Sequence, residues 1–494
     1  MAGGSMRRIL LIIVILLGGL LAALFVGLSR LPAAAARGAA PVAVNVDADA
    51  AAARLAAAIR IPTVSATPEA PNDAAFDALA ALLREHYPRV HAALALEKVG
   101  AHGLLYRWDG RDPSLPPLLL LAHQDVVPVD AAGESRWQHA PFSGDIADGY
   151  VWGRGTLDDK GSLIAQMEAV EALLAQGYAP QRTVYFAYGH DEEIGGDDGA
   201  RKIAARLKAL GVRAWFALDE GGAITRGVVA GVTAPVASVM VAEKGYASFE
   251  LRAHESGGHS SMPPPVTAIG RLARAVARLE AQPMPARVTP AVATMLETLA
   301  PQLPFAQRLA IANRWLFGPL LLDQLAQAPV TNALIRTTTA PTVFNAGVKD
   351  NVLPGEALAI VNFRLLPGDT IADVQRHVVD TIADPAVEVR LQAEFADEAS
   401  PPADASGPGY ALVRRSVEEV FPDALVVPGL VVGATDLRHY ADVIEARYNF
   451  NPGRLDAADL ERIHGIDERL AVAEFADMVR FYQRFLINAS GTPG

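Results

Sequence analysis

Histidine and carboxylate side chains gather just after short apolar segments of this sequence. Residues 118–122 precede His123 and Asp125, residues 183–188 precede three adjacent carboxylates, and residues 215–218 precede two more. The carboxylates of the second and third clusters are Asp191, Glu192, Glu193, Asp219 and Glu220. Imidazole and carboxylate groups without thiolates suit a zinc, manganese or cobalt site. The pattern therefore predicts a metal centre.

Each cluster also has a plainer interpretation when it is taken alone. On an extended segment His123 and Asp125 point to the same side, so Asp125 can orient the imidazole, although a polar strand end looks the same. Asp158 and Asp159 lie between glycines at the start of a helix, where a carboxylate also serves as an N-cap. The carboxylates at 191–193 repel one another unless a cation compensates them, and the alternative is a solvated acidic loop.

Two further histidines lie beside glycine residues. His259 belongs to residues 257–261 and His464 to residues 463–469, and each alone is more simply read as a surface histidine. Two cations roughly 3.5–4 Å apart need a bridging carboxylate and further protein ligands for each ion. Taken together, the clusters and these histidines offer such a set.

The elements around these residues predict an α/β sandwich with a mostly parallel central sheet. The strand-length segments alternate with helical patterns, one after Lys160 and another at residues 199–210. The first helix has a single apolar stripe, formed by Leu163, Ile164, Met167, Val170, Leu173 and Leu174. Ligands of such sheets bind beyond the carboxyl ends of the strands, where the clusters fall.

A second domain of ferredoxin-like, β-α-β-β-α-β type is expected to interrupt the first. Its expected strands are residues 248–253, 357–365 and 387–394, and its helices are residues 267–280 and 371–382. Residues 284–330 form an additional helical excursion. The predicted domains are 47–235 and 399–494 for the catalytic part and 236–398 for the inserted part.

The N-terminus carries an uninterrupted apolar run from Ile9 to Leu28. Such a run is long enough to cross the roughly 30 Å hydrocarbon core of a membrane. Residues 1–30 are therefore expected to be a membrane anchor, and residues 31–46 a linker. Arg7 and Arg8 favour a cytoplasmic N-terminus, with the body on the outer side. The alternative is a signal peptide that is cleaved within residues 31–40.

Composition narrows the possible functions. The chain has 494 residues, 51% of them hydrophobic, which excludes a disordered protein. Its net charge is −12 and it has no long basic run, so nucleic-acid binding is not expected. The chain contains no cysteine, which excludes disulfides, thiolate metal ligands and a catalytic thiol.

The ordered motifs resemble one family from about residue 50 to the end. They include LLLLAHQDVVPVD, WGRGTLDDKGSL, GHDEEIGG, LDEGG, GGHSSMPP, NFRLLPGDT and RIHGIDERL. This set is similar to the co-catalytic zinc metallopeptidases, which include carboxypeptidase S, aminoacylase-1, glutamate carboxypeptidase and succinyl-diaminopimelate desuccinylase. The branch it resembles most is that of carboxypeptidase S and the N-fatty-acyl amino acid hydrolases.

The resemblance implies a role for each matching residue. Two divalent cations, Zn²⁺ or else Co²⁺ or Mn²⁺, would be held by His123, Asp158, Glu193, Asp219 and His464. Asp158 would bridge the ions, and the peptide bond between Asp158 and Asp159 would be cis. Asp125 would orient His123, Glu192 would be the general base and acid, and His259 would donate to the oxyanion. Arg364, Asn345 and Gly433 would bind the substrate.

The expected activity is hydrolysis of peptides or N-acyl amino acids that have a free α-carboxylate. One alternative is an N-fatty-acyl amino acid hydrolase or aminoacylase with little peptidase activity, whose acyl chain could lie on residues 301–322. A packed helical pair is the simpler reading of those residues. Another alternative is a membrane-tethered binding protein without catalysis. The inserted domain would act as a lid and could form a homodimer.

Overall fold

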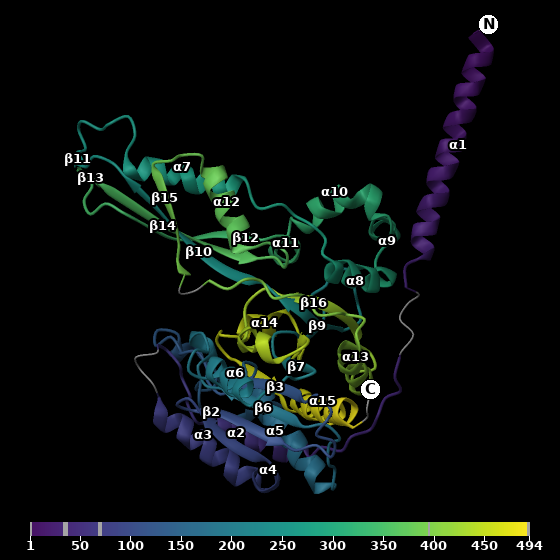
Figure 1. The fold of residues 1–494 in the computed structure, drawn as a ribbon, viewed down its shortest axis with the longest axis vertical. Coiled ribbons are helices and arrows are strands. Elements are labelled where there is room, and N and C mark those ends of the chain that lie inside the picture. Colours follow the sequence, from purple (N-terminus) through teal and green to yellow (C-terminus); the bar gives the residue numbers. More distant parts are fainter. Residues whose placement is uncertain (1, 33–37, 68–71, 394–395, 492–494) are drawn as a thin grey trace. The chain divides into compact units, whose positions relative to one another are not determined.

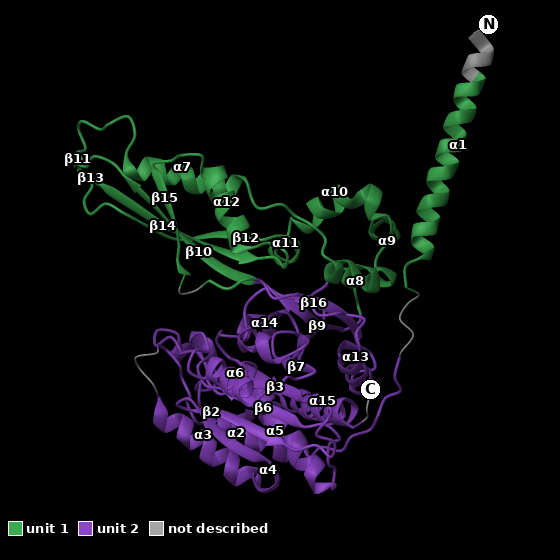
Figure 2. Ribbon diagram, in the orientation of Figure 1, with its two compact units in different colours: residues 1–36, 230–233, 245–398 green, residues 37–229, 234–244, 399–494 purple. Residues whose placement is uncertain are grey.

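The computed structural model describes residues 2–32, 38–67, 72–393 and 396–491 (Figure 1). Its chain divides into two compact units (Figure 2). Unit 1 comprises residues 1–36, 230–233 and 245–398, and unit 2 comprises residues 37–229, 234–244 and 399–494. The fold of unit 2 is therefore assembled from separate stretches of the sequence.

Unit 2 is built around a 10-stranded sheet of order β1-β2-β6-β3-β7-β17-β9-β8-β18, with β16 also paired to β9. The strands are β1 (Ala95–Val99), β2 (Gly103–Trp108), β3 (Leu118–His123), β6 (Val184–Gly189), β7 (Phe216–Asp219), β8 (Ile224–Thr225), β9 (Val236–Glu243), β16 (Leu425–Val431), β17 (Arg447–Asn449) and β18 (Arg454–Leu455). A 3-stranded sheet joins β4 (Ile146–Ala147), β5 (Tyr150–Trp152) and β19 (Arg469–Ala471).

The large sheet is mixed, whereas the sequence predicted a mostly parallel one. Strand β3 runs parallel to β6 and β7, and β7 runs parallel to β17. The pairs β1–β2, β2–β6 and β8–β9 are antiparallel. The reason is the length of some connections: only residues 100–102 separate β1 from β2, and a parallel pair needs a much longer crossover.

Helices flank this sheet and include both of those expected from the sequence. They are α2 (Ala48–Ile59), α3 (Asp73–His86), α4 (Pro88–Ala93), α5 (Lys160–Ala175), α6 (Ala200–Ala209), α13 (Pro408–Val420), α14 (Ala457–Arg462) and α15 (Val472–Ser490). Helix α5 is buried on almost every side of its first three turns, from Lys160 to Val170. It is therefore a core helix, and its buried face is wider than one stripe.

Unit 1 contains a 4-stranded antiparallel sheet of order β12-β14-β10-β15. Its elements follow the expected β-α-β-β-α-β order: β10 (Gly245–His254), α7 (Ala268–Ala281), β12 (Thr338–Ala346), β14 (Glu356–Leu365), α12 (Ile371–Ile382) and β15 (Val387–Leu391). Strand β14 alternates between buried and less buried positions, which is typical of a sheet with one covered face. Strand β9, expected in this domain from residue 236, instead pairs within the large sheet of unit 2.

The expected helical excursion lies between α7 and β12. It consists of α8 (Pro290–Leu299), α9 (Phe305–Ala312), α10 (Arg314–Leu325) and α11 (Pro329–Ile335). These helices pack around a small core of their own, formed by Val292, Leu296, Ala300, Ile311 and Ile335. A two-stranded pair, β11 (Gly258–His259) and β13 (Val352–Leu353), lies elsewhere in unit 1.

Helix α1 (Ala2–Ser29) contains the apolar N-terminal run. A stretch of 18 residues within 7–29 has a mean hydropathy of 3.3, and the helix is long and apolar enough to cross a membrane; a signal sequence has the same character. The backbone carbonyl of Leu24 accepts a hydrogen bond from the amide Nδ2 of Asn313, at 3.2 Å. The helical excursion of unit 1 therefore contacts the end of this helix.

Candidate metal centre

The predicted clusters meet at one edge of the large sheet. Strand β3 ends at His123 and lies between β6 and β7, both of which run parallel to it. Carboxyl ends of neighbouring parallel strands share an edge, so residues that follow β6 and β7 lie near His123. The site is built within unit 2 alone.

His123 is held at one ring nitrogen and presents the other to carboxylates. Its Nδ1 lies 3.0 Å from the backbone oxygen of Asp125 and 3.3 Å from the carboxylate of that residue. Its Nε2 lies 2.9 Å from Oδ1 of Asp158 and 3.6 Å from Oε1 of Glu220. The proton therefore belongs on Nδ1, and Nε2 is free to ligate a metal.

Asp158 stands between two imidazoles and offers a different oxygen to each. Oδ1 faces His123, and Oδ2 lies 3.0 Å from Nε2 of His464. Burial opposes the ionised form, but the two imidazoles outweigh it and hold the pKa of Asp158 below its usual value. The peptide bond between Asp158 and Asp159 is cis, as the resemblance implied. Each oxygen of Asp158 therefore faces a different imidazole.

Glu193 and His464 complete a second group around Asp158. Nε2 of His464 lies 3.3 Å from Oε2 of Glu193. Hydrogen bonds with Asp158 and Glu193 raise the pKa of His464 to about 10. His464, Glu193 and Asp158 therefore form one candidate ligand group, and His123, Asp158 and Glu220 form the other.

Glu220, not Asp219, is the carboxylate that faces His123. Asp219 is the last residue of β7, and its Oδ2 accepts a hydrogen bond from the backbone nitrogen of Leu437 at 3.1 Å. Neighbouring side chains of an extended segment point in opposite directions, so only one of this pair can face the site. The sequence predicted Asp219 as the ligand, and the structure brings the next residue there instead.

Asp125 contacts more of the site than its predicted role requires. Its Oδ1 accepts a hydrogen bond from the backbone nitrogen of Glu192 at 3.2 Å, and its Oδ2 accepts one from that of Glu193 at 3.1 Å. One fully buried carboxylate therefore orients His123 and also fixes the turn η2 (Glu192–Ile194). Burial raises the pKa of Glu192 well above its usual value.

A buried ion pair that the sequence analysis missed joins the loops of Asp158 and His464. Nη1 of Arg154 lies 2.5 Å from Oε2 of Glu468, and Nη2 donates to the carbonyl of His464 at 3.0 Å. Oε1 of Glu468 accepts hydrogen bonds from the backbone nitrogens of Gly155 and Leu157, both at 2.9 Å. Both residues occur in the quoted motifs, as WGRG and DERL, but nothing in the spacing pairs them.

The remaining predicted residues lie in other surroundings. Gly433 belongs to unit 2 and lines a cavity beside Asp158 and Glu220. His259, Asn345 and Arg364 belong to unit 1. Nδ1 of His259 accepts a hydrogen bond from the backbone nitrogen of Ser261 at 3.2 Å, which leaves the proton on Nε2. The guanidinium of Arg364 lies 4.6 Å from the ring centroid of Tyr246. The substrate and oxyanion roles of these residues stay predictions.

The donor set fits a pair of divalent cations. Burial, with repulsion from Asp158, raises the pKa of Glu220 to about 7, so this carboxylate resists ionisation unless positive charge compensates it. Oε1 of Glu193 is buried and has no hydrogen-bond partner among the residues that the structure describes. A cation at each group would satisfy both observations, because carboxylate oxygens and imidazole nitrogens are zinc ligands.

Comparison with known proteins shows the family of this chain. The sequence profile of "Peptidase family M20/M25/M40" matches residues 119–488, which include every candidate ligand. The chain belongs to this family. M20 membership makes the chain a hydrolase of a metal-dependent peptidase family and confirms the resemblance found in the sequence.

Relatives within the M20 family share much of the chain. The N-fatty-acyl-amino acid synthase/hydrolase PM20D1 of Bos taurus is 42% identical over 438 residues, which cover 88% of this chain and 86% of the relative. The probable carboxypeptidase S-like 2 of Dictyostelium discoideum is 40% identical over 408 residues, 82% of this chain and 78% of the relative. Both belong to the branch that the motifs indicated.

Solved structures share the M20 fold. The crystal structure of an M20 family metallo-carboxypeptidase from Sulfolobus solfataricus matches with a TM-score of 0.64 at 19% identity. The match covers 88% of this chain and 98% of that one. It confirms an α/β fold of this family.

Proposed function

We propose that the protein hydrolyses amides whose amine half is an amino acid with a free α-carboxylate, using two divalent cations. The observation that carries this proposal is the position of Asp158, with one oxygen toward His123 and the other toward His464. A carboxylate that bridges two cations presents one oxygen to each, and here each oxygen of Asp158 lies beside an imidazole that could bind the same cation.

One cation would be held by His123, Asp158 and Glu220, and the other by Asp158, Glu193 and His464. Glu220 replaces Asp219 in this assignment because its carboxylate faces His123. Zn²⁺ suits these nitrogen and oxygen ligands best, with Co²⁺ or Mn²⁺ as alternatives. When bound, the pair would supply a water of lowered pKa and polarise the substrate carbonyl.

Glu192 is the proposed proton carrier. Its carboxylate takes a proton from the attacking water and returns it to the nitrogen of the departing amine as the amide C–N bond breaks. The oxygen of that water joins the acyl carbon, so the products are a carboxylic acid and an amino acid. Asp125 supports this step by fixing the backbone of Glu192.

The residues of unit 1 have proposed roles at the substrate. Nε2–H of His259 donates a hydrogen bond to the carbonyl oxygen as negative charge develops, a contribution of about 10²–10³ in rate for a single donor. Arg364 pairs with the free carboxylate, for which its forked guanidinium is suited. Asn345 and Gly433 contact the substrate beside it. Unit 1 would act as a lid and a homodimer contact.

The proposal has two forms, which differ in the acyl half of the substrate: an N-acyl amino acid or a peptide. Relatives at 40–42% identity are called N-fatty-acyl-amino acid synthase/hydrolase, which favours N-acyl amino acids. The carboxypeptidase S-like relatives favour peptides. Parallel assays of N-acyl amino acids and of short peptides, each with a free and with an amidated carboxylate, would separate them. Loss of hydrolysis on amidation is expected in both cases.

Glu192→Gln tests the mechanism directly. It should lower kcat by about 10²–10⁴ while both metal ions stay bound, because only the proton carrier is lost. Glu134→Gln, an exposed carboxylate of the same unit, is the matched control and should leave kcat unchanged. Full activity of Glu192→Gln with metals bound would show that the assigned base is wrong. Wild-type protein that takes up no metal would favour a binding protein instead.

We propose that α1 anchors the protein in a membrane, with the catalytic body on the outer side. The support is the apolar length of residues 7–29 together with Arg7 and Arg8 before the apolar core. The alternative is a secreted protein that has lost this helix. Membrane fractionation combined with N-terminal sequencing of the mature chain distinguishes the two.

A further inference from the structure

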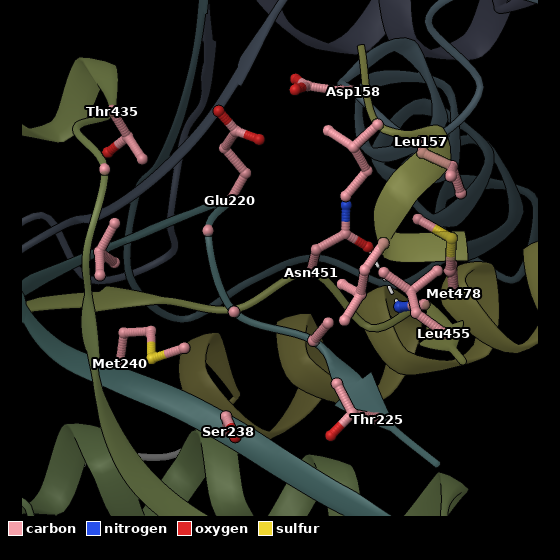
Figure 3. Close-up of a pocket in the computed structure, with 18 of the residues that line it drawn as sticks. Leu157, Asp158, Glu220, Thr225, Ser238, Met240, Thr435, Asn451, Leu455 and Met478 are labelled. Atoms are coloured by element: carbon pink, nitrogen blue, oxygen red, sulfur yellow. Dashed lines mark hydrogen bonds between the residues drawn. The ribbon is translucent and has the colours of Figure 1, made fainter. Parts of the chain in front are cut away.

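Unit 2 contains an apolar cavity of about 350 Å³ beside the metal centre (Figure 3). Its volume falls in the range of small-molecule sites. The wall includes Leu157, Met240, Val431, Leu455, Leu470 and Met478. All the lining residues belong to unit 2, so the cavity is a property of that unit alone.

The cavity begins at the candidate ligands themselves. Asp158 and Glu220 line it directly, and their chain neighbours Leu157 and Gly221 continue its wall. Ile463, which precedes the ligand His464, lines it as well. If the carbonyl of a substrate lies at the metal centre, the acyl chain attached to it can therefore extend into this cavity.

Asn451 and Thr435, two polar residues of the cavity wall, already have hydrogen-bond partners. Nδ2 of Asn451 donates to the hydroxyl of Ser162 at 3.1 Å, and its Oδ1 accepts from the nitrogen of Gly453 at 3.1 Å. The hydroxyl of Thr435 donates to the carboxylate of Glu243 at 2.5 Å. Apart from Asp158 and Glu220, the lining residues carry no charge. A free α-ammonium group of a peptide would thus have no anion to pair with beyond the metal ligands.

We infer that this cavity holds the unbranched acyl chain of an N-acyl amino acid. The inference rests on the proposed function and specifies its substrate class. A hydrocarbon chain gains from leaving water and loses no hydrogen bonds in such a wall. The helical excursion, considered above for this role, has a core of its own instead, which includes Ile311 and Ile335.

Chain length provides the first test. Burial of one methylene contributes about 0.8 kcal/mol, which corresponds to roughly a fourfold rise in kcat/KM for each added methylene. A series of N-acyl amino acids from acetyl to palmitoyl, kept below their critical micelle concentrations, should follow this slope and then level off once the cavity is full. Hydrolysis of the acetyl compound with no slope would overturn the cavity assignment and leave the proposed function standing. Hydrolysis of no acyl or peptide substrate would overturn the proposed function.

Two substitutions shorten the cavity at its far end. Ser238 and Thr225 lie opposite Asp158 and Glu220 in Figure 3. Ser238→Phe should lower the ratio of palmitoyl to acetyl kcat/KM by about fifteenfold for each two methylenes displaced. Thr225→Phe is the second variant and should shift the ratio in the same direction. Ser114→Phe, on an exposed loop of unit 2, is the control for the added ring.

A binding measurement keeps the test independent of turnover. Calorimetry with dodecanol on the metal-loaded, full-length protein measures binding in the cavity without turnover, because the alcohol has no amide bond. Wild type and Ser114→Phe should bind the alcohol equally, and both cavity variants should bind it at least tenfold more weakly. Equal binding by all four proteins, or equal loss of palmitoyl and acetyl activity in the cavity variants, would overturn the assignment.

Discussion

Glu468→Gln offers a sharp test of how the metal centre is held together. Glu468 is fully buried and pairs with Arg154, while its other oxygen accepts hydrogen bonds from Gly155 and Leu157. The substitution keeps the size of the side chain and one oxygen acceptor, and it leaves the guanidinium of Arg154 buried without its counter-charge. Removal of one partner from a buried pair costs about 3–5 kcal/mol.

That cost should fall on the loop that carries Asp158. Native-state hydrogen exchange at the amides of Gly155 and Leu157 reports it directly, because Glu468 accepts their hydrogen bonds. A loss of about 3 kcal/mol corresponds to exchange that is more than a hundredfold faster. Zinc affinity should fall about 10–100-fold, the usual effect of losing a partner behind the ligands.

Asp442→Asn is the matched control for Glu468→Gln. Asp442 is an exposed carboxylate that pairs with Lys208 elsewhere in unit 2. Its removal should change neither the exchange rates nor the zinc affinity, because exposed pairs contribute little. Unchanged exchange at Gly155 and Leu157 in Glu468→Gln, together with wild-type zinc affinity, would refute the reasoning. The pair would then be a bystander of the site.

Three further changes probe the site and its surroundings. Glu220→Gln should lower the affinity for one of the two zinc ions at least tenfold, whereas Asp219→Asn should leave both affinities unchanged. Competition with a chelator measures both affinities. A loss of affinity in Asp219→Asn and not in Glu220→Gln would restore Asp219 as the ligand. Asp125→Asn should lower kcat about 10–100-fold and change KM less, because the turn of Glu192 loses its anionic acceptor. Burial raises the pKa of Glu243, so its contribution to stability is complete below about 4.5 and is lost as pH rises through the raised value. Glu243→Gln should therefore gain in urea midpoint over wild type between pH 4 and pH 8; a constant difference would contradict the raised pKa.

Much of this fold could be predicted from hydrophobic patterning. The helix at residues 371–382 and the strand at residues 357–365 were expected almost as they occur, because an amphipathic helix and an alternating strand each have a clear period. The mixed pairing of the large sheet was not predicted. Strand direction depends on partners far apart in the sequence, and apolar runs of equal length look alike in either direction.

The site shows the same limit at the level of single residues. That His123, Asp158, Glu193 and His464 come close together could be predicted because their motifs are distinctive and ordered. The choice between Asp219 and Glu220 depends on which way a strand end turns its side chains, and the sequence offers two carboxylates in a row. The link between Arg154 and Glu468 spans more than 300 positions, so only the folded chain reveals it.

The way the chain leaves and re-enters unit 2 has a consequence for the order of folding. The carbonyl of Glu243 accepts a hydrogen bond from the nitrogen of Ser400 at 3.1 Å, and Tyr246 and Asp397 exchange two more at 2.8 Å each. Once these hydrogen bonds have formed, the two ends of residues 245–398 are held together and the segment is no longer a long open loop. Relative to a tight turn, such a loop would cost on the order of 3 kcal/mol to close. When the two ends of the inserted unit pair with each other, this entropic cost of closure no longer opposes the pairing of β9 with β16. His464 lies in the stretch of unit 2 that follows the inserted unit, so bringing it to His123 and Asp158 depends on this pairing.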